Sequence, residues 1–181
     1  QYSDHGHDHY GIDRGADMHP YLGYNYRISE LHAAVGLAQI KKLDSFLVLQ
    51  KRNHQIIFNC LNTIEGISFR RIPDADGDTG SFLSFFLPTA EQAKAAATAL
   101  AEAGIGGNPY WYDNNWHYIR KWEHLKSAAF LNRIADEQKD AILHYANQNF
   151  SASDAIISRC ISSAISLAWT EEQAHERGTK M

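Results

Sequence analysis

Three histidines stand at alternate positions near the start of the chain, in the segment SDHGHDHYG (residues 3–11). In an extended backbone this spacing places His5, His7 and His9 on one side, where three imidazoles could bind Zn²⁺ and leave a fourth position open. Because histidine titrates near neutral pH, His5 or His7 could instead contact a substrate or move a proton in an active site. Gly6 favours a turn here, and a solvated polar loop is the third interpretation. The residues alone leave all three open.

A second group of candidate residues lies in GYNYRISELHAAVGLAQIKKLD (residues 23–44). Gly23 favours a turn, which brings Asn25 and Arg27 directly before a segment with helical periodicity. A side-chain amide and a guanidinium are hydrogen-bond donors that suit an anion such as a phosphate or a carboxylate. Alternatively, Asn25 supports the turn and Arg27 forms an ion pair at the surface.

The third group is the aromatic segment NPYWYDNNWHYIRKWEHL (residues 108–125). Its rings could stack on sugars while Asn114, Asn115 and His117 bond to hydroxyl groups. The alternative is a packed loop whose aromatic side chains fill the core of a small domain. The aromatic residues in question are Tyr110, Trp111, Tyr112, Trp116, Tyr118 and Trp122.

The elements that must position these residues follow from periodicity. Residues 1–27 have no regular pattern and predict a long irregular loop. Apolar residues from Ile28 onward predict one long helix that ends near Gly66, bends around Asp44 and Ser45 or bridges two domains. Because the apolar residues occupy two helical faces, we expect this helix to be buried from more than one side.

The remaining segments predict an α/β or α+β small domain. Residues 67–73 and 81–88 read as strands, and the second is apolar enough to lie in the middle of a sheet. Thr89 with Gln92, and Thr170 with Gln173, have the spacing of capping boxes that begin helices. Residues 130–150 predict an interrupted helix, and residues 152–166 predict a further helix.

Composition excludes several classes of protein. The 181 residues carry a formal net charge of -4 at pH 7 with no run of Lys or Arg, so we expect no nucleic-acid partner. No apolar run approaches the roughly 20 residues of a membrane helix, and we expect no membrane partner. Cys60 and Cys160 fit neither a disulfide framework nor a metal-ligand spacing, which favours the cytoplasm. A start at Gln1 and a helix that opens shortly before Met181 suggest a piece of a longer protein.

The segment 23–44 resembles the DegT/DnrJ/StrS family of sugar aminotransferases. The family pattern has Gly, Asn and Arg at alternate positions, then a helix with paired alanines and a Gln-hydrophobic-x-x-Leu ending. The segment Asp4 to Gly6 is similar to the family's His-Gly loop, and the resemblance continues more loosely to SLAWTEEQ (residues 166–173). The matching positions are Gly23, Asn25, Arg27, Ala33, Ala34, Gly36, Gln39 and Leu43.

The resemblance implies a pyridoxal 5'-phosphate enzyme with the α/β, aspartate aminotransferase-like fold (fold type I), acting as a homodimer with a composite active site. It implies that Asn25 reaches the phosphate of the partner subunit's cofactor and that Arg27 orients this phosphate or the substrate. A His-Tyr pair near the substrate pocket of the family corresponds to His117 and Tyr118. The reaction implied is transfer of an amino group from glutamate to a keto-sugar, and no metal is expected.

The resemblance also implies that the lysine that forms the Schiff base lies upstream of this chain. None of the chain's lysines stands in a matching motif, so we expect no catalytic residue here and no activity of the chain alone. Residues 1–27 would then be an active-site loop of the large domain, residues 28–54 a bridging helix and residues 55–181 a small C-terminal α/β domain.

Within the family, the opening loop and the insert NNWHYIRKWEHLK (residues 114–126) are most similar to a branch that aminates a free keto-acid sugar for lipopolysaccharide. Its substrate would be 8-oxo-3,8-dideoxy-manno-octulosonate, whose carboxylate could meet Arg27, Arg14 or the histidines His5 and His7. Four alternatives stay open: an aminotransferase for nucleotide-linked sugars, a dehydratase of the same family, a metallohydrolase built on the histidine loop, and a non-catalytic sugar-binding module.

Overall fold

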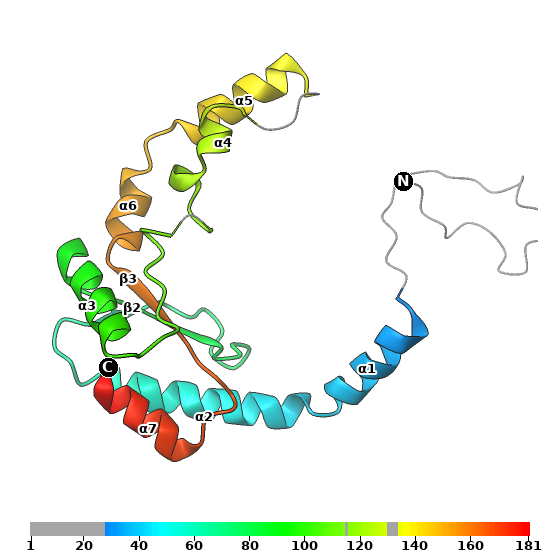
Figure 1. Cartoon of the computed structure of the whole chain (residues 1–181), viewed down its shortest axis with the longest axis vertical. Coiled ribbons are helices and arrows are strands. Elements are labelled where there is room, and N and C mark those ends of the chain that lie inside the picture. The colour runs from blue at the N-terminus through cyan, green and yellow to red at the C-terminus, as the bar shows by residue number, and fades with distance from the viewer. Residues whose placement is uncertain (1–27, 115, 130–133) are drawn as a thin grey trace, which may run out of the picture. The chain divides into compact units, whose positions relative to one another are not determined.

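A computed structural model describes residues 28–114, 116–129 and 134–181 and divides the chain into two compact units, residues 1–43 and residues 44–181. Four predicted site residues, His5, His7, Asn25 and Arg27, lie outside the described residues. Figure 1 shows the larger unit as a small sheet with some of its helices beside it and others, drawn in yellow, extending away from it.

The predicted long helix is two helices, α1 (Glu30–Ile40) and α2 (Leu43–Leu61), so the expectation of one continuous helix with a bend near Asp44 was wrong. At the break, the Lys42 N–H donates to the Gln39 carbonyl at 2.9 Å, three residues back, which tightens the last turn of α1 and ends it. At its other end α2 stops at Leu61, five residues before the predicted end at Gly66. After Leu61 the chain enters a turn, in which the N–H groups of Thr63 and Ile64 again donate to carbonyls three residues back.

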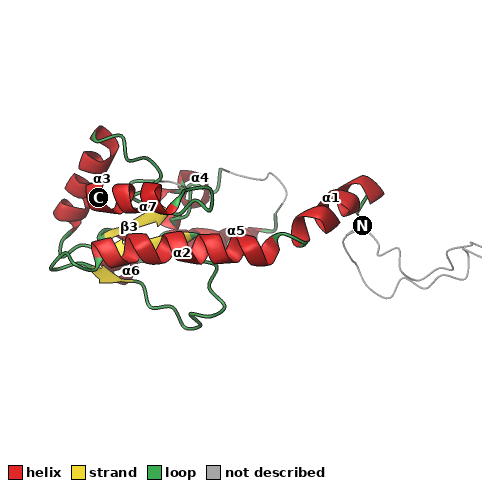
Figure 2. Cartoon of the chain, turned by 90° about the horizontal axis from the view of Figure 1, so that it is seen from below, coloured by secondary structure: helices red, strands yellow, loops and turns green. Residues whose placement is uncertain are grey.

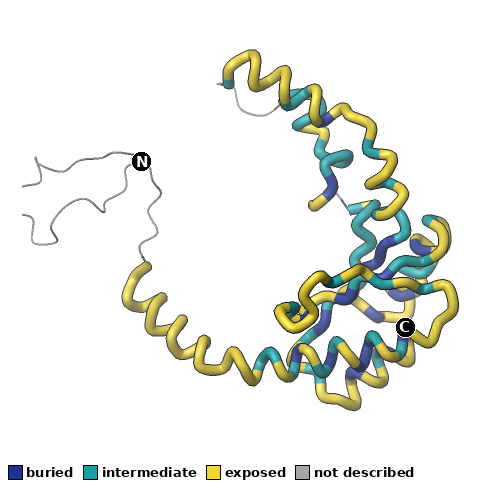
Figure 3. Tube along the Cα trace, turned by 180° about the vertical axis from the view of Figure 1, so that it is seen from behind, coloured by how far each residue is buried: buried dark blue, intermediate teal, exposed yellow. Residues whose placement is uncertain are grey.

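The two helices differ in burial. Helix α1 has no buried residue, and its apolar side chains, such as Leu31 (75% exposed) and Ile40 (64% exposed), face outward. The prediction of burial from several sides is therefore wrong for α1 among the described residues. Helix α2 does reach the core and buries Ile56, Ile57 and Leu61, but Val48 and Asn59 remain exposed. Figure 3 shows this contrast along the chain.

The sheet of the larger unit has three antiparallel strands in the order β1 (Ser68–Phe69), β2 (Phe82–Phe86) and β3 (Cys160–Ala164). The two strands expected at residues 67–73 and 81–88 are confirmed, and β2 lies in the middle as predicted. The helix expected over residues 152–166 was wrong in its second half. Helix α6 (Ser151–Ile157) ends there, and the chain continues as β3.

Pairing explains why this half is a strand. Phe85 lies opposite Ile161 on the face that α2 covers, and on the other face the Ser84 and Ser162 hydroxyls lie 2.8 Å apart. The second edge of β3 is occupied as well, since the N–H groups of Ser162 and Ala164 donate to the carbonyls of Pro109 and Gly107. A segment that has hydrogen-bond partners on both edges and packing partners on both faces is more stable as a strand than as a helix.

The helices around the sheet begin and end at local signals. The capping boxes of Thr89 with Gln92 and of Thr170 with Gln173 are confirmed, and they start α3 (Ala90–Glu102) and α7 (Glu171–Lys180). Helix α3 ends in a Schellman motif, in which Gly104 has a φ of 73° and the Ile105 N–H donates to the Leu100 carbonyl at 2.8 Å. The remaining helical elements are η2 (Ile119–Lys121), α4 (Glu123–Lys126) and α5 (Asp136–Ala146).

Helices α2 and α7 lie side by side against the sheet (Figure 2). Gly178 makes this close approach possible, because a Cβ atom there would lie 2.7 Å from the Cys60 sulfur. The buried core beneath them combines residues of α2, β2 and β3 and the segment that follows β3. Its members are Ile57, Leu61, Leu83, Phe85, Ile161 and Ile165. Among the described helices, none has the length and apolar character needed to cross a membrane.

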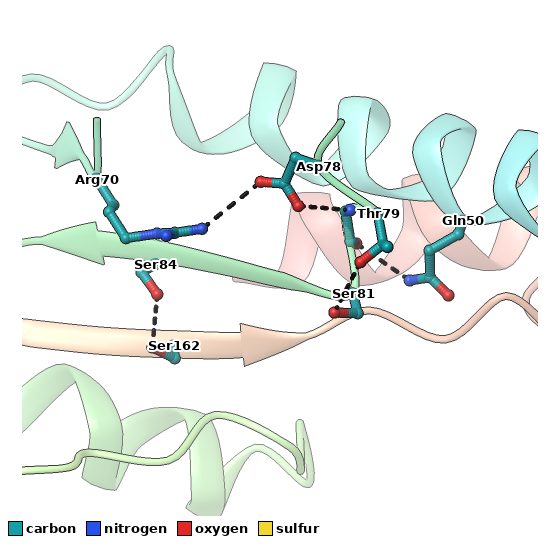
Figure 4. Close-up of polar contacts among 8 residues, drawn as sticks. Gln50, Arg70, Asp78, Thr79, Ser81, Ser84 and Ser162 are labelled. Carbon is teal, nitrogen blue, oxygen red and sulfur yellow. Dashed lines mark hydrogen bonds and ion pairs between the residues drawn. The ribbon is translucent and has the colours of Figure 1, made fainter. Parts of the chain in front are cut away.

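Two polar side chains of α2 donate hydrogen bonds to backbone carbonyls that lie outside the strand pairing of the sheet. The Gln50 amide donates to the carbonyls of Gly80 at 3.1 Å and Ile165 at 2.6 Å (Figure 4 shows the bond to Gly80). The Asn53 amide donates to the carbonyls of Ser166 at 2.9 Å and Trp169 at 3.0 Å. These bonds hold the start of β2 and the connection from β3 to α7 against one helix. We call this set of bonds the α2 amide clamp.

Replacing the fully buried Asn53 tests the clamp. We expect Asn53→Ala to lower the free energy of unfolding by about 1–3 kcal/mol, because the fully buried amide loses the bonds it donates to Ser166 and Trp169 and the Arg52 Nε loses its acceptor, while the Trp169 carbonyl keeps the bond from Arg52 Nη2. Asn59→Ala, at an exposed position of the same helix, should cost about 0.5 kcal/mol or less. Urea unfolding of both variants measures the difference, and equal losses would contradict the assignment.

Candidate functional site

The aromatic segment forms one wall of a cavity of about 310 Å³. Trp111, His117 and Tyr118 line it from one side, and Ile157 and Cys160 line it from the end of α6 and the start of β3. The structure thus brings together the predicted pair His117 and Tyr118 with two residues about forty positions away that sequence reasoning missed. The segment is positioned by its bonds to the edge of β3 through Gly107 and Pro109.

Tyr118 is buried, with 5% of its surface exposed, and its hydroxyl donates to the Asp154 carboxylate of α6. Arg120 approaches the same carboxylate, with its Nε donating to Oδ1 at 2.8 Å and its Nη2 pairing with Oδ2. Burial raises the pKa of the Tyr118 phenol above its ordinary value, and the bond donated to Asp154 raises this pKa further. Tyr118 and Arg120 therefore fasten the aromatic segment to α6.

His117, in contrast to the buried Tyr118, lies at the surface. Its ring is exposed and meets the Trp111 ring edge-on, with the ring centroids 4.9 Å apart, while the more distant Trp116 is 70% exposed. A ring that is held by an aromatic neighbour and open to solvent can contact a ligand in the cavity. Of the predicted pair, His117 therefore presents its ring to solvent, whereas Tyr118 is buried and bonded to Asp154.

The other aromatic side chains divide in the same way. Tyr110 packs against the core, and its hydroxyl donates to the Ser158 carbonyl at 2.7 Å. Trp111 and Tyr112 are half-buried, whereas Trp116 is exposed. The interpretation as a packed loop therefore holds for Tyr110 and Tyr118, and an exposed aromatic surface is left at Trp116.

Cys160 gives the cavity a thiol, and burial raises the pKa of that thiol. It therefore stays protonated at neutral pH and is a poor nucleophile. The partner residues Asp154 and Cys160 carry no spacing signal in the sequence, because they reach Tyr118 and His117 only once α6 and β3 are folded against the aromatic segment. Only the tertiary structure could identify them.

An aldehyde cofactor that is held covalently needs an enclosed lysine. All eight lysines of the chain lie among the described residues, and none of them is buried. Lys51 bonds to the Asp76 carbonyl, Lys94 pairs with Asp113, Lys126 with Glu123 and Lys180 with Glu176. None of these surface positions fits an enclosed cofactor pocket, so no reaction step is assigned to a lysine of this chain.

Across residues 28–114, 116–129 and 134–181, no group of three or more His, Cys, Asp or Glu side chains has a geometry that could hold a metal ion. The histidine cluster of His5, His7 and His9 falls outside these residues.

The anchoring role of Asp154 can be tested by removing its charge. We expect Asp154→Asn to lower the midpoint of thermal unfolding by roughly 3–6 °C, because Tyr118 and Arg120 both lose a charged acceptor. Asp113→Asn breaks only the exposed pair with Lys94 and should shift the midpoint by about 1 °C. Calorimetry of the two variants measures this, and equal shifts would count against the anchor.

The raised pKa of Tyr118 predicts a dependence of stability on alkaline pH. Below pH about 10, the phenol is protonated in both the folded and the unfolded chain. As the pH rises further, the unfolded phenol ionises first, so stability falls until the pH passes the folded pKa. We expect Tyr118→Phe to have a shallower decline of unfolding free energy above pH 10, measured by urea unfolding. An unchanged decline would contradict the environment described for Tyr118.

Comparison with known proteins identifies the family of this chain. The family model described as DegT/DnrJ/EryC1/StrS aminotransferase family matches residues 1–144, which include the opening loop, both helices α1 and α2 and the whole aromatic segment. Members of this family are pyridoxal phosphate-dependent aminotransferases of fold type I, and the mixture of helices with a small antiparallel sheet is compatible with a part of that fold. On this match the chain belongs to the DegT/DnrJ/EryC1/StrS aminotransferase family.

Proposed function

We propose that the protein to which this chain belongs transfers an amino group from glutamate to a free keto-sugar, 8-oxo-3,8-dideoxy-manno-octulosonate, in the cytoplasm and for lipopolysaccharide biosynthesis. The observation that carries the proposal is the family match over residues 1–144. The choice of sugar rests on the resemblance of residues 3–44 and 114–126 to the branch that acts on this keto-acid.

Pyridoxal phosphate, when bound, supplies the electron sink that lets the amino group pass between donor and acceptor. The proposed task of Asn25 and Arg27 is to hold the phosphate of the partner subunit's cofactor, for which an amide and a guanidinium are suitable donors. This assignment makes the enzyme a homodimer in which each active site is composite. The exposed apolar side chains of α1, among them Leu31 and Ile40, support a role of that helix in contacts beyond this chain.

The proposed substrate contacts are His5, His7, Arg27, His117 and Tyr118. The geometry supports a division between the last two, since the open ring of His117 can bond to a sugar hydroxyl while Tyr118 is engaged with Asp154. The carboxylate of the keto-acid would meet Arg27, His5 or His7.

The domain assignment follows from these roles. We propose that residues 1–27 belong to an active-site loop of the large domain, that residues 28–54 bridge the domains and that residues 55–181 form the small domain. Because none of the eight lysines is buried, the structure offers no enclosed lysine, which supports the proposal that the lysine which holds the cofactor lies outside this chain and that the chain alone is inactive.

The decisive experiment uses the protein expressed together with its upstream coding sequence. With glutamate and 8-oxo-3,8-dideoxy-manno-octulosonate it should release 2-oxoglutarate, and the sugar product should gain an amino group by mass spectrometry. Transfer to a nucleotide-linked keto-sugar in place of the free sugar would contradict the proposed substrate, whereas the proposed aminotransferase reaction would still hold. Absence of any glutamate-dependent transfer would contradict the function itself.

The role of His117 is tested in the same protein. We expect His117→Ala to raise the KM for the sugar about tenfold, the loss of roughly one hydrogen bond, with the cofactor absorbance unchanged. His124→Ala is the matched control, because His124 is also exposed and stacks on Trp122 but does not line the cavity. A KM that stays constant in His117→Ala would remove His117 from the substrate contacts.

A further inference from the structure

A second cavity, of about 280 Å³, lies between α2 and the loop that joins β1 to β2. It lies wholly within residues 44–181 and shares no lining residue with the cavity at His117. Ligand-binding cavities begin at roughly 300 Å³ and combine apolar walls with a few converging polar groups. The size of this cavity therefore suits a small molecule of about one ring.

The apolar wall is aromatic. Phe58 of α2 and Phe69 of β1 lie with their ring centroids 4.6 Å apart and an interplanar angle of 47°. Phe82 at the start of β2 also lines the cavity and is 44% exposed. Tilted and edge-on ring arrangements are those that aromatic pairs prefer, so a further ring can pack among these side chains.

The polar side of the cavity has an unpaired nitrogen. The Nε2 atom of His54 is buried and has no hydrogen-bond partner among the described residues. Burial is the main influence on this imidazole and lowers its pKa, so the ring is neutral at pH 7. A buried polar atom without a partner costs stability, and a ligand that bonds to it would offset this cost.

The charges at the cavity favour an anion. The charged side chains in its lining are Lys51, Arg70 and Asp78, two cationic and one anionic. Arg70 contacts Asp78 through Nη2 only, at 3.5 Å, and stays 52% exposed, so other donors of its guanidinium are directed elsewhere (Figure 4). Asp78 is in turn held in the loop, since its Oδ1 accepts the Gly80 N–H at 2.9 Å.

The loop is fixed against α2 in a way that keeps the cavity formed. Gly80 is buried with a φ of 69°, and a Cβ atom there would lie 3.1 Å from the Cβ of His54. The α2 amide clamp holds the Gly80 carbonyl through Gln50, and Lys51 bonds to the Asp76 carbonyl at 2.6 Å. The polar groups of the cavity are therefore preorganised on both sides, which reduces the entropy cost of binding.

We propose that the cavity between α2 and the β1–β2 loop is a binding site for a small aromatic carboxylate. The ring packs among Phe58, Phe69 and Phe82, and the carboxylate accepts hydrogen bonds from Arg70 and from the Nε2–H tautomer of His54. This site is separate from the aminotransferase reaction, which neither requires nor assigns it.

Phenylacetate is the probe for this proposal, with phenylacetamide and acetate as its uncharged and ringless counterparts. The 181-residue chain should bind phenylacetate saturably in ligand-observed NMR, about tenfold more tightly than phenylacetamide, because the amide loses the charge-assisted bonds. Acetate should show no saturable binding. On addition of phenylacetate, the ring C–H signals of His54, identified by their loss in His54→Gln, should shift.

Two variants give the matched comparison. Arg70→Gln should weaken the binding of phenylacetate about tenfold. Arg71→Gln, at the adjacent exposed residue that does not line the cavity, should leave it unchanged. Ala75→Trp, which fills the mouth of the cavity, should abolish binding, and circular dichroism verifies that each variant is folded. Absence of saturable binding, equal binding by Arg70→Gln, or binding without a shift of the His54 signals would each overturn the proposal.

Discussion

The α2 amide clamp is the interaction on which the arrangement of the larger unit depends. After β3 the chain leaves the sheet, and the carbonyls of Ile165, Ser166 and Trp169 have no strand opposite them. Because a buried carbonyl without a donor costs about 1–3 kcal/mol, these groups need partners from outside the sheet. Gln50 and Asn53 supply them from α2, and Gln50 also holds the carbonyl of Gly80 just before β2. The same helix thereby fixes the ends of two neighbouring strands.

The α2 amide clamp also determines the shape of both cavities. The edge of β3 that faces away from β2 donates hydrogen bonds to the carbonyls of Gly107 and Pro109. The pairing ends at Pro109, because proline has no N–H group to donate back to β3. The aromatic segment therefore starts from a defined point and is fastened again at Tyr118 by Asp154. On the other side of the unit, the bond to Gly80 sets how closely the β1–β2 loop approaches His54. One set of hydrogen bonds thus positions the walls of two cavities that share no lining residue.

Sequence reasoning succeeded where the cause of a structure lies within a few residues. The caps at Thr89 and Thr170 depend on a partner three positions away, and both were predicted correctly. It failed at β3, because the apolar residues from Ile156 to Ile165 fit a helical and a strand period equally, and only pairing with β2 decides between them. It could not find the α2 amide clamp either, since Gln50 and Asn53 look like surface residues until their acceptors, 30 positions away at Gly80 and more than 110 positions away at Ile165, Ser166 and Trp169, are in place.

The same distinction separates His117 from Tyr118. Adjacent residues with polar rings offer no sequence criterion for which one binds a ligand, so both were predicted as substrate contacts. The structure separates them through Asp154, a residue 36 positions away that accepts the Tyr118 hydroxyl and also pairs with Arg120. The backbone is held at Tyr118 and at the β3 edge, and the exposed ring of His117 lies edge-on to Trp111 with no hydrogen bond to another part of the chain that the structure describes. A side chain that is positioned by its neighbours and not by its own polar bonds retains its donors and acceptors for a ligand, which is what a substrate contact requires.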